Sequence, residues 1–315
     1  MNTQNIEKLN RSKALYRELR TNALDALTGD HPNAIWNQLA RMIIDEVWFK
    51  AVIRIRERVG QPPMNPHLWN TFITGYAITQ SLAIRRLTEG KGGVASLLAI
   101  VRKIKNNVSL LTREVMVGHD GTSMDVPGLL EEMADSVEYG EGGHIGKPDP
   151  LATQRWSDAD HAHVAFDRLR DADMGAPRSP VDRVSDVVLD RLITALTSDA
   201  IKRVRYQCDK YLAHADLSDL SGGLVGPTYN DIHESVQTLV EVKQFLCADF
   251  FNHSSGSVVP TYQGDQLANL SVPLVPSMPA ETYHEAWNKV VAEVEAWGNV
   301  EHFRRFNLHQ SQSSR

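Results

Sequence analysis

The chain has few cysteines and no long apolar run, and each shortage excludes a class of protein. Its 315 residues include two cysteines, Cys208 and Cys247, too few for the disulfide framework of a small secreted protein. The longest apolar runs, such as 94–101, are too short to cross a bilayer. Residues 1–13 lack the apolar stretch of a secretory signal. We therefore expect a soluble, cytoplasmic protein with no membrane partner.

Positive charge is not in excess either. The sequence has 33 basic and 39 acidic residues, which gives a formal net charge of −6. A protein that coats nucleic acid over its whole surface needs an excess of lysine and arginine, so this class is excluded. A local basic patch is compatible with the balance. The hydrophobic share of 42% is typical of a globular protein with a real core.

No motif indicates a metal or a cofactor. The run 158–163 contains Asp158, Asp160, His161 and His163, all of types that bind metals. On a helix, however, His161 and His163 diverge, and no further cluster has ligand spacing. We interpret the run as a helix N-terminus with solvated polar residues. The glycines at 90–93 lack the spacing of a phosphate-binding loop and indicate a turn.

Apolar residues recur three or four positions apart along most of the chain, and this spacing predicts helices. The pattern covers 31–60, a stretch that starts at Pro66 and ends before the glycines at 90, 97–115, 181–213, 228–250 and 283–297. Thr228 and Asp231 predict a capping box at the start of one of them. Short links between long amphipathic helices favour antiparallel neighbours. The sequence therefore predicts an all-α antiparallel bundle, with residues 1–315 forming a single helical domain.

The periodicity fails in three places. Residues 118–180 are rich in Gly, Asp and Pro around one short helical piece, and we interpret them as a surface insertion or long loop. Residues 252–279 predict an irregular loop. The polar tail 308–315 is expected to fray.

The stretch "RYQCDKYLAHAD", Arg205 to Asp216, ends a long predicted helix. Cys208 continues an apolar stripe and is expected in the core. Lys210 and Tyr211 are predicted to lie one turn before His214 on its side of the helix, with Asp216 just past the end. The helix dipole favours a protonated His214, whereas Lys210 opposes it. This arrangement suits either proton transfer or a helix cap.

The residues "DKYLAHAD" resemble the end of the signature of the HEPN superfamily, in its abortive-infection U branch. The upstream stretch 80–104, "QSLAIRRLTEGKGGVASLLAIVRKI", is similar to that branch as well, and the resemblance extends from Trp36 to Phe251. It implies a helical bundle that forms a homodimer and acts in a defence or toxin-type system. Many members are metal-independent RNA endonucleases whose paired motifs meet in one cleft. A cognate antitoxin or another defence protein is then an expected partner.

The resemblance implies specific roles. His214 would be the general acid/base, oriented by Asp216, and Lys210 would bind the phosphate together with Arg85 or Arg86 from the preceding helix pair. Asp209 and Tyr211 would contact the substrate.

One position departs from the family motif, because Cys208 stands where the motif has arginine. A neutral thiol does not hold a phosphate. Three alternatives follow: a ribonuclease with a cation from elsewhere, a catalytically inactive module that binds RNA, a nucleotide or a protein, and a helical scaffold with no RNA role.

Overall fold

The computed structural model describes residues 3–58, 65–90, 95–137, 147–170, 176–212, 227–254, 258–259 and 280–296. Within these ranges the chain is helical, with two isolated β-bridges and no strand. The prediction of an all-α fold is confirmed. The chain divides into two compact units, Met1–Thr261 and Tyr262–Arg315. The second unit contains one described helix, α11 (Ala280–Ala296).

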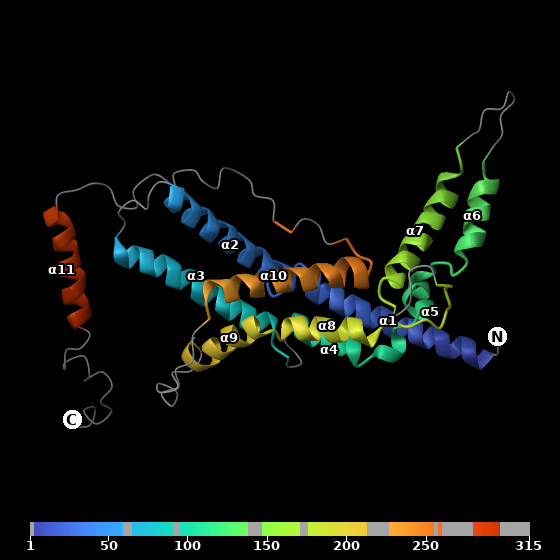
Figure 1. Cartoon of the computed structure of the whole chain (residues 1–315), viewed down its shortest axis with the longest axis horizontal. Helices are drawn as coiled ribbons and strands as arrows, with labels where there is room; N and C mark the ends of the chain where they lie inside the picture. The colour runs from blue at the N-terminus through green and yellow to red at the C-terminus, as the bar shows by residue number, and fades with distance from the viewer. Residues whose placement is uncertain are drawn as a thin grey trace, which may run out of the picture. The chain divides into compact units, whose positions relative to one another are not determined.

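The first unit is built around α10 (Tyr229–Phe245), which packs against α2 (Ile35–Arg58), α3 (Pro66–Leu87), α8 (Asp186–Leu196) and α9 (Asp199–Gln207) (Figure 1). Its other α-helices are α1 (Thr3–Thr28), α4 (Leu97–Lys105), α5 (Arg113–Met116), α6 (Val126–Asp135) and α7 (Pro150–Asp167). Short 3₁₀ turns, η1 (Val108–Leu110) and η2 (Gly118–Asp120), flank α5. None of the helices in the described ranges has the length and apolarity that a membrane span requires.

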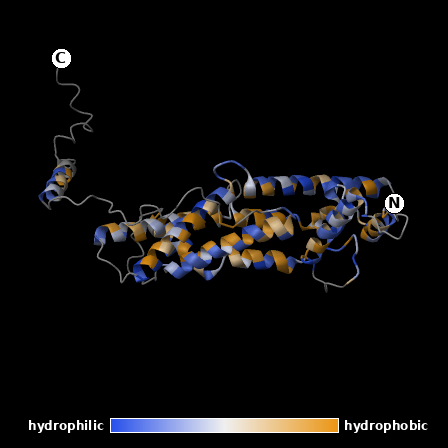
Figure 2. Ribbon diagram, turned by 90° about the horizontal axis from the view of Figure 1, so that it is seen from above, coloured by the Kyte–Doolittle hydropathy of each residue, from blue (hydrophilic) through white to orange (hydrophobic). Residues whose placement is uncertain are grey.

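The core follows the predicted apolar stripe of the motif helix, whereas Val47 and Ile55 of α2 and Phe72 of α3, also on predicted stripes, are exposed. Apolar residues of the first unit gather on the inward sides of its helices, and polar residues cover the outside (Figure 2). The stripe that leads to the motif stretch is buried at Leu189, Leu196, Val204 and Cys208. Burial of this apolar surface is the main favourable contribution to folding.

Two predicted helices are interrupted. The seam 97–115 divides into α4, η1 and α5, because α4 ends at the pair Asn106–Asn107. The helix predicted over 181–213 divides at Thr197, and Ser198 caps the start of α9. Side chains of Asn and Ser compete for backbone hydrogen bonds, which favours helix ends at these positions.

The insertion 118–180 is more ordered than the sequence predicted. It contains two helices, α6 and α7, that lie side by side, where the sequence indicated one short helix (Figure 1). The Gly/Asp/Pro composition hid α7, whose Asp149 cap and Pro150 are in fact a helix start signal. Phe166 and Leu169 join the main core. Of the predicted loop 252–279, only 252–254 and 258–259 are described, and the tail 308–315 lies outside the described residues.

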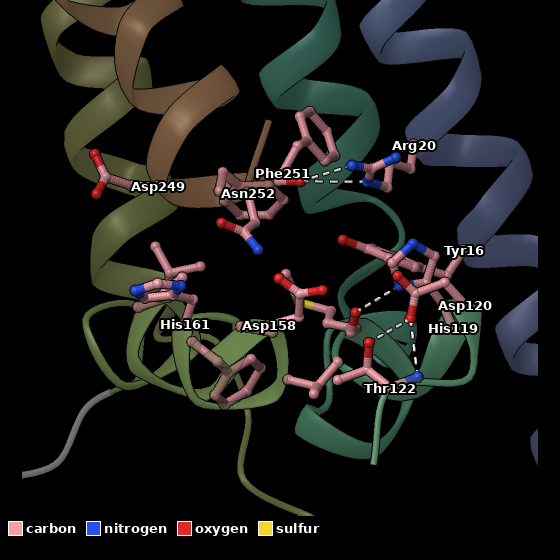
Figure 3. Close-up of a pocket in the computed structure, with 17 residues that line it drawn as sticks. Tyr16, Arg20, His119, Asp120, Thr122, Asp158, His161, Asp249, Phe251 and Asn252 are labelled. Atoms are coloured by element: carbon pink, nitrogen blue, oxygen red, sulfur yellow. Dashed lines mark hydrogen bonds between the residues drawn. The ribbon is translucent and has the colours of Figure 1, made fainter. Parts of the chain in front are cut away.

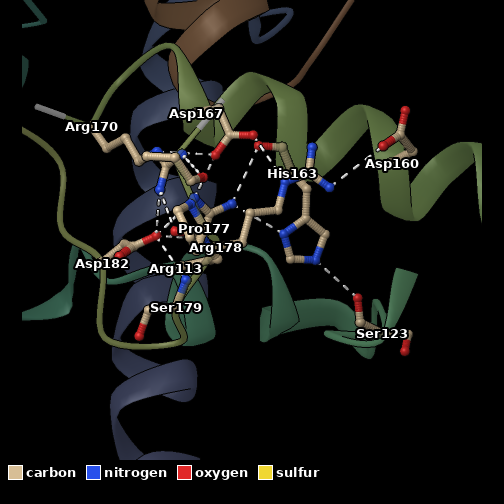
Figure 4. A network of polar contacts seen from close by, with 11 residues as sticks. Arg113, Ser123, Asp160, His163, Asp167, Arg170, Pro177, Arg178, Ser179 and Asp182 are labelled. Carbon is tan, nitrogen blue, oxygen red and sulfur yellow. Dashed lines mark hydrogen bonds and ion pairs between the residues drawn. The ribbon is translucent and has the colours of Figure 1, made fainter. Parts of the chain in front are cut away.

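A buried ionic network holds the insertion to the bundle (Figure 4). The Arg113 side chain is fully buried, and its Nε and Nη2 donate to Asp182 at 3.1 and 3.0 Å. Nη2 of Arg113 also donates to Asp167, which accepts a further hydrogen bond from Arg178 at 3.0 Å. Arg170 forms ion pairs with both aspartates. Arg178 also pairs with Asp160 at 3.6 Å, so three guanidinium groups share three carboxylates.

His163 belongs to the same network, which corrects its interpretation as a solvated residue. Its Nε2 lies 3.2 Å from the carbonyl of Ser123, and its Nδ1 lies 3.2 Å from Nη1 of Arg113. A carbonyl only accepts and a guanidinium only donates, so the ring is neutral with its proton on Nε2. Burial lowers the pKa of His163, although the bond to Ser123 opposes the shift.

The predicted capping box is present at the start of α10. Thr228 accepts a hydrogen bond from the backbone of Asp231, and the Asp231 carboxylate accepts one from the backbone of Thr228. Asp231 is buried and also accepts hydrogen bonds from Arg203 of α9. The bond from Arg203 is the main cause that lowers the pKa of Asp231 to about 2.

This shift predicts a pH dependence of stability. In the unfolded chain the pKa of Asp231 is about 3.9. Because the folded value is lower, the ionised carboxylate stabilises the fold above about pH 4, and this contribution is lost as the pH falls towards 2. Urea unfolding at stepped pH should show a smaller fall of the unfolding free energy in Asp231→Asn than in the parent. An equal fall of the unfolding free energy in the two proteins would contradict the lowered pKa of Asp231.

Candidate functional site

The motif stretch changes helix type where the chemistry was predicted. After Gln207, α9 continues as a π-helical turn, η3 (Cys208–Leu212). Such turns are rare and occur often at functional sites. Asp209 and Lys210 are half-buried in η3. The prediction that Lys210 and His214 share one side of the helix assumed α-helical geometry. The π-helical turn has more residues per turn, so this assumption does not hold in η3.

The other predicted site residues of this stretch are Tyr211, His214 and Asp216. The backbone of Tyr211 belongs to η3, but its side chain lies outside the described residues. His214 and Asp216 also lie outside them. Their roles therefore stay predictions.

Cys208 is a core residue, as its place on the apolar stripe predicted. Its exposed fraction is 0%, and burial raises the pKa of its thiol to about 11, against the opposing effect of Arg85. The thiol is therefore neutral at physiological pH. It supplies neither a cation nor a thiolate to this site.

Arg85 lies beside Cys208 and contacts the motif stretch directly. Its Nε donates a hydrogen bond to the carboxylate of Asp209, and this bond is the main cause that raises the pKa of Arg85. The side chains of Arg85 and Asp209 are 36% and 44% exposed. A guanidinium has five N–H donors, so the bond through Nε leaves both Nη groups for a ligand.

The structure separates Arg86 from this site. Its Nη1 lies 3.4 Å from Oε1 of Gln38 on α2. The two adjacent arginines of α3 thus point to different neighbours. Of this pair, Arg85 is the residue brought to the motif.

Two arginines of α9 fix the position of the motif relative to its neighbours. Nη1 of Arg205 donates to the carbonyl of Thr88, the last residue of the α3 cap, at 2.9 Å. Arg203 is bound to Asp231. Because both are engaged in packing contacts, we assign them positioning roles rather than substrate contacts.

A cavity of about 470 Å³ opens next to η3, between α3 and the start of α10. Its polar lining consists of Thr74, Ser81, Gln207, Thr228 and Tyr229. Tyr229 is 47% exposed. Ser81 precedes Arg85 by four residues, so their Cα atoms are about 6 Å apart along the axis of α3. Sequence reasoning missed this lining, because no local pattern brings α3 and α10 together.

Comparison with protein families agrees with this geometry. The model of the HEPN family AbiU2 matches residues 30–269, about three quarters of the chain. The chain belongs to the AbiU2 family of HEPN proteins. Its AbiU2 region includes α3, η3, α10 and the cavity between them. No curated protein and no solved structure matches the chain. Family membership indicates an abortive-infection type of defence protein.

In this AbiU2 protein, the residues described by the structure contain no group of three or more His, Cys, Asp or Glu side chains arranged to hold a metal. The run 158–163, which the sequence indicated to be a helix N-terminus, lies in the middle of α7 instead. His163 is buried in the ionic network, whereas His161 is exposed at the helix surface.

The neutral Cys208 predicts slow thiol chemistry. In native protein treated with iodoacetamide at pH 7.5, both cysteines should stay unmodified. Cys247 is buried like Cys208, and burial raises the pKa of both thiols. Unfolding in urea should make both react. Mass spectrometry of the labelled peptides measures this. Fast labelling of Cys208 in the folded state would show that it is a reactive residue.

Proposed function

We propose that this AbiU2 protein is a metal-independent RNA endonuclease in which Arg85 takes over the task of the motif arginine. The observation that supports the proposal is the hydrogen bond from Arg85 to Asp209, the neighbour of Cys208. This bond holds a permanent cation beside the position from which the family arginine is missing. The bond through Nε also orients the planar fork of the guanidinium.

In the proposed reaction, the 2′-hydroxyl of RNA attacks the adjacent phosphate. The 2′-oxygen forms a bond to phosphorus while the bond to the 5′-oxygen breaks, which leaves a 2′,3′-cyclic phosphate and a 5′-hydroxyl. His214 accepts the proton of the 2′-hydroxyl, since an imidazole can gain and lose a proton near neutral pH. Arg85, aided by Lys210, stabilises the charge that grows on the phosphate.

The second proton is supplied by a second copy of the chain. The 5′-oxygen leaves as an alcohol only if an acid protonates it. One histidine cannot be the neutral base and the protonated acid at the same time. We propose a homodimer in which His214 of the second copy supplies this proton and Asp216 orients each imidazole. The cavity beside η3 then accepts a base of the RNA, which stacks on Tyr229.

The burial of Cys208 favours a second candidate, an RNA- or nucleotide-binding protein without cleavage activity. The motif position is part of the core, so this chain has lost the motif arginine itself. Losing one preorganised donor typically slows such a reaction about 100- to 1,000-fold. In this case Arg85 and the cavity bind the ligand, and a defence partner or antitoxin responds to the bound state.

Cleavage of a mixed RNA pool in EDTA by the purified protein tests the proposal. The parent should produce 2′,3′-cyclic phosphate ends, and His214→Ala should be about 100- to 10,000-fold slower. His67→Ala is the matched control, because His67 is exposed at the start of α3, about 27 Å from Arg85 along the helix. Binding of RNA without cleavage would select the second candidate. Neither binding nor cleavage would exclude both.

A further inference from the structure

A second cavity of the first unit lies away from the motif stretch. Its volume is about 430 Å³, and its walls come from α1, η2, α7 and a π-helical turn, η5 (Leu246–Phe250), that ends α10 (Figure 3). Phe166, Leu169 and Phe250 form part of an apolar floor that is continuous with the core. None of the lining residues belongs to α3, α9 or η3. The cavity is therefore separate from the proposed nuclease site.

Several polar groups at this cavity already have partners. Arg20 donates to the carbonyl of Phe251 through Nη2 at 2.9 Å and Nε at 3.3 Å. Nδ1 of His119 donates to the carbonyl of Met116 at 2.8 Å. These bonds shape the cavity and occupy donors that could otherwise hold an anion.

Tyr16 is the exception. The residue is 2% exposed and lines the cavity, and no hydrogen bond engages its hydroxyl within the described part of the chain. The ring contacts His119 edge-on, with 5.3 Å between centroids. Burial keeps the hydroxyl neutral by raising its pKa. Because Tyr16 lines the cavity, a group that enters it can form a hydrogen bond to this hydroxyl, which adds to its affinity.

The charge of the lining is negative. Asp120, Asp158 and Asp249 line the cavity against one cation, Arg20, and Asp249 is paired with Arg168 outside it. Burial raises the pKa of Asp120, but hydrogen bonds from Thr122 outweigh this effect and leave the pKa below its usual value. Asp120 is therefore ionised at neutral pH.

Asp158 supplies the carboxylate best placed for a ligand. It is exposed, and no hydrogen bond or ion pair engages it within the described part of the chain. Figure 3 shows Asp158 and Asn252 on facing walls of the cavity. Asn252 has a φ of 45°, a left-handed conformation that Asn tolerates and that ends η5 at this rim.

We propose that this cavity binds a small organic cation, a primary ammonium compound with an apolar body. The ammonium group lies between the carboxylates of Asp120 and Asp158, and the hydroxyl of Tyr16 accepts one of its three N–H bonds. The apolar body packs on Phe166 and Phe250. An anion is disfavoured because the carboxylates outnumber the cations in the lining.

Calorimetric titration of the full chain with phenethylamine tests this site. Phenethyl alcohol and phenylacetate have the same ring with a neutral and a negative group, so they measure the contribution of charge. Phenethylamine should bind at least about 10-fold more tightly than either, as charge-assisted hydrogen bonds are the stronger ones. Equal affinity for the alcohol, or no binding of the amine up to about 10 mM, would overturn the proposal.

Two variants connect the binding to the named residues. Asp158→Asn should weaken phenethylamine binding about 10- to 100-fold, whereas Asp135→Asn, an exposed control on α6, should have no effect. Tyr16→Phe should weaken binding without lowering the unfolding temperature of the ligand-free protein, because the hydroxyl has no partner there. Unchanged binding in Asp158→Asn would also overturn the proposal.

Discussion

Cleavage of RNA by Arg85→Gln should be about 100- to 1,000-fold slower than by the parent. Arg85 is the cation of α3 that contacts the motif stretch, through its bond to Asp209. Glutamine keeps a donor of similar length but removes the permanent charge and the planar fork that hold a phosphate. The loss should appear in the single-turnover rate in EDTA, because the charge to be stabilised grows in the transition state.

Arg86→Gln is the matched control. It makes the same change of charge at the next residue of the same helix, but Arg86 points to Gln38 on α2. Its rate should stay within about 3-fold of the parent, since the loss of an exposed charge away from the site has a small effect. Thermal unfolding followed by circular dichroism should show that both variants are folded. Equal losses in the two variants would mean that Arg85 does not replace the motif arginine.

The second large effect concerns stability. Asp167→Asn should lower the free energy of unfolding by about 3–5 kcal/mol, the usual cost of removing one member of a buried ion pair. Asp167 is 5% exposed and accepts hydrogen bonds from Arg113 and Arg178. Without its charge, Arg113 and Arg170 share the carboxylate of Asp182, and Arg178 keeps its ion pair with Asp160. The change preserves the shape of the side chain, so the loss is electrostatic.

Asp190→Asn is the control for this measurement. Asp190 forms an ion pair with Lys105, but the two side chains are 57% and 38% exposed. Exposed pairs contribute at most about 1 kcal/mol. Urea unfolding midpoints of the two variants should therefore differ clearly. A small loss in Asp167→Asn would show that the network does not hold the insertion to the bundle.

The burial of Cys208 affects how the missing motif arginine can be studied. Restoring arginine at position 208 would place a charged side chain in the core, next to the guanidinium of Arg85. Such a variant should fold poorly, because a buried charge without a partner is strongly unfavourable. Changes at Arg85 and His214 are therefore the informative ones.

The sequence by itself determined the helical class, most helix positions and the family. Apolar residues at intervals of three and four specify which side of a helix is buried, and this signal is local. It placed Cys208 in the core and, with Thr228 and Asp231, gave the start of α10. The motif stretch, together with the upstream stretch 80–104 and the helical pattern, indicated the HEPN family.

The tertiary structure decided which of these residues meet. Arg85 and Arg86 are adjacent and chemically identical, and only the packing of α3 against α9 and α2 directs one to Asp209 and the other to Gln38. The ionic network around Arg113 and the two cavities join segments more than 50 residues apart. Helical periodicity carries no information on such pairings, because they depend on which helices become neighbours once their apolar sides are buried.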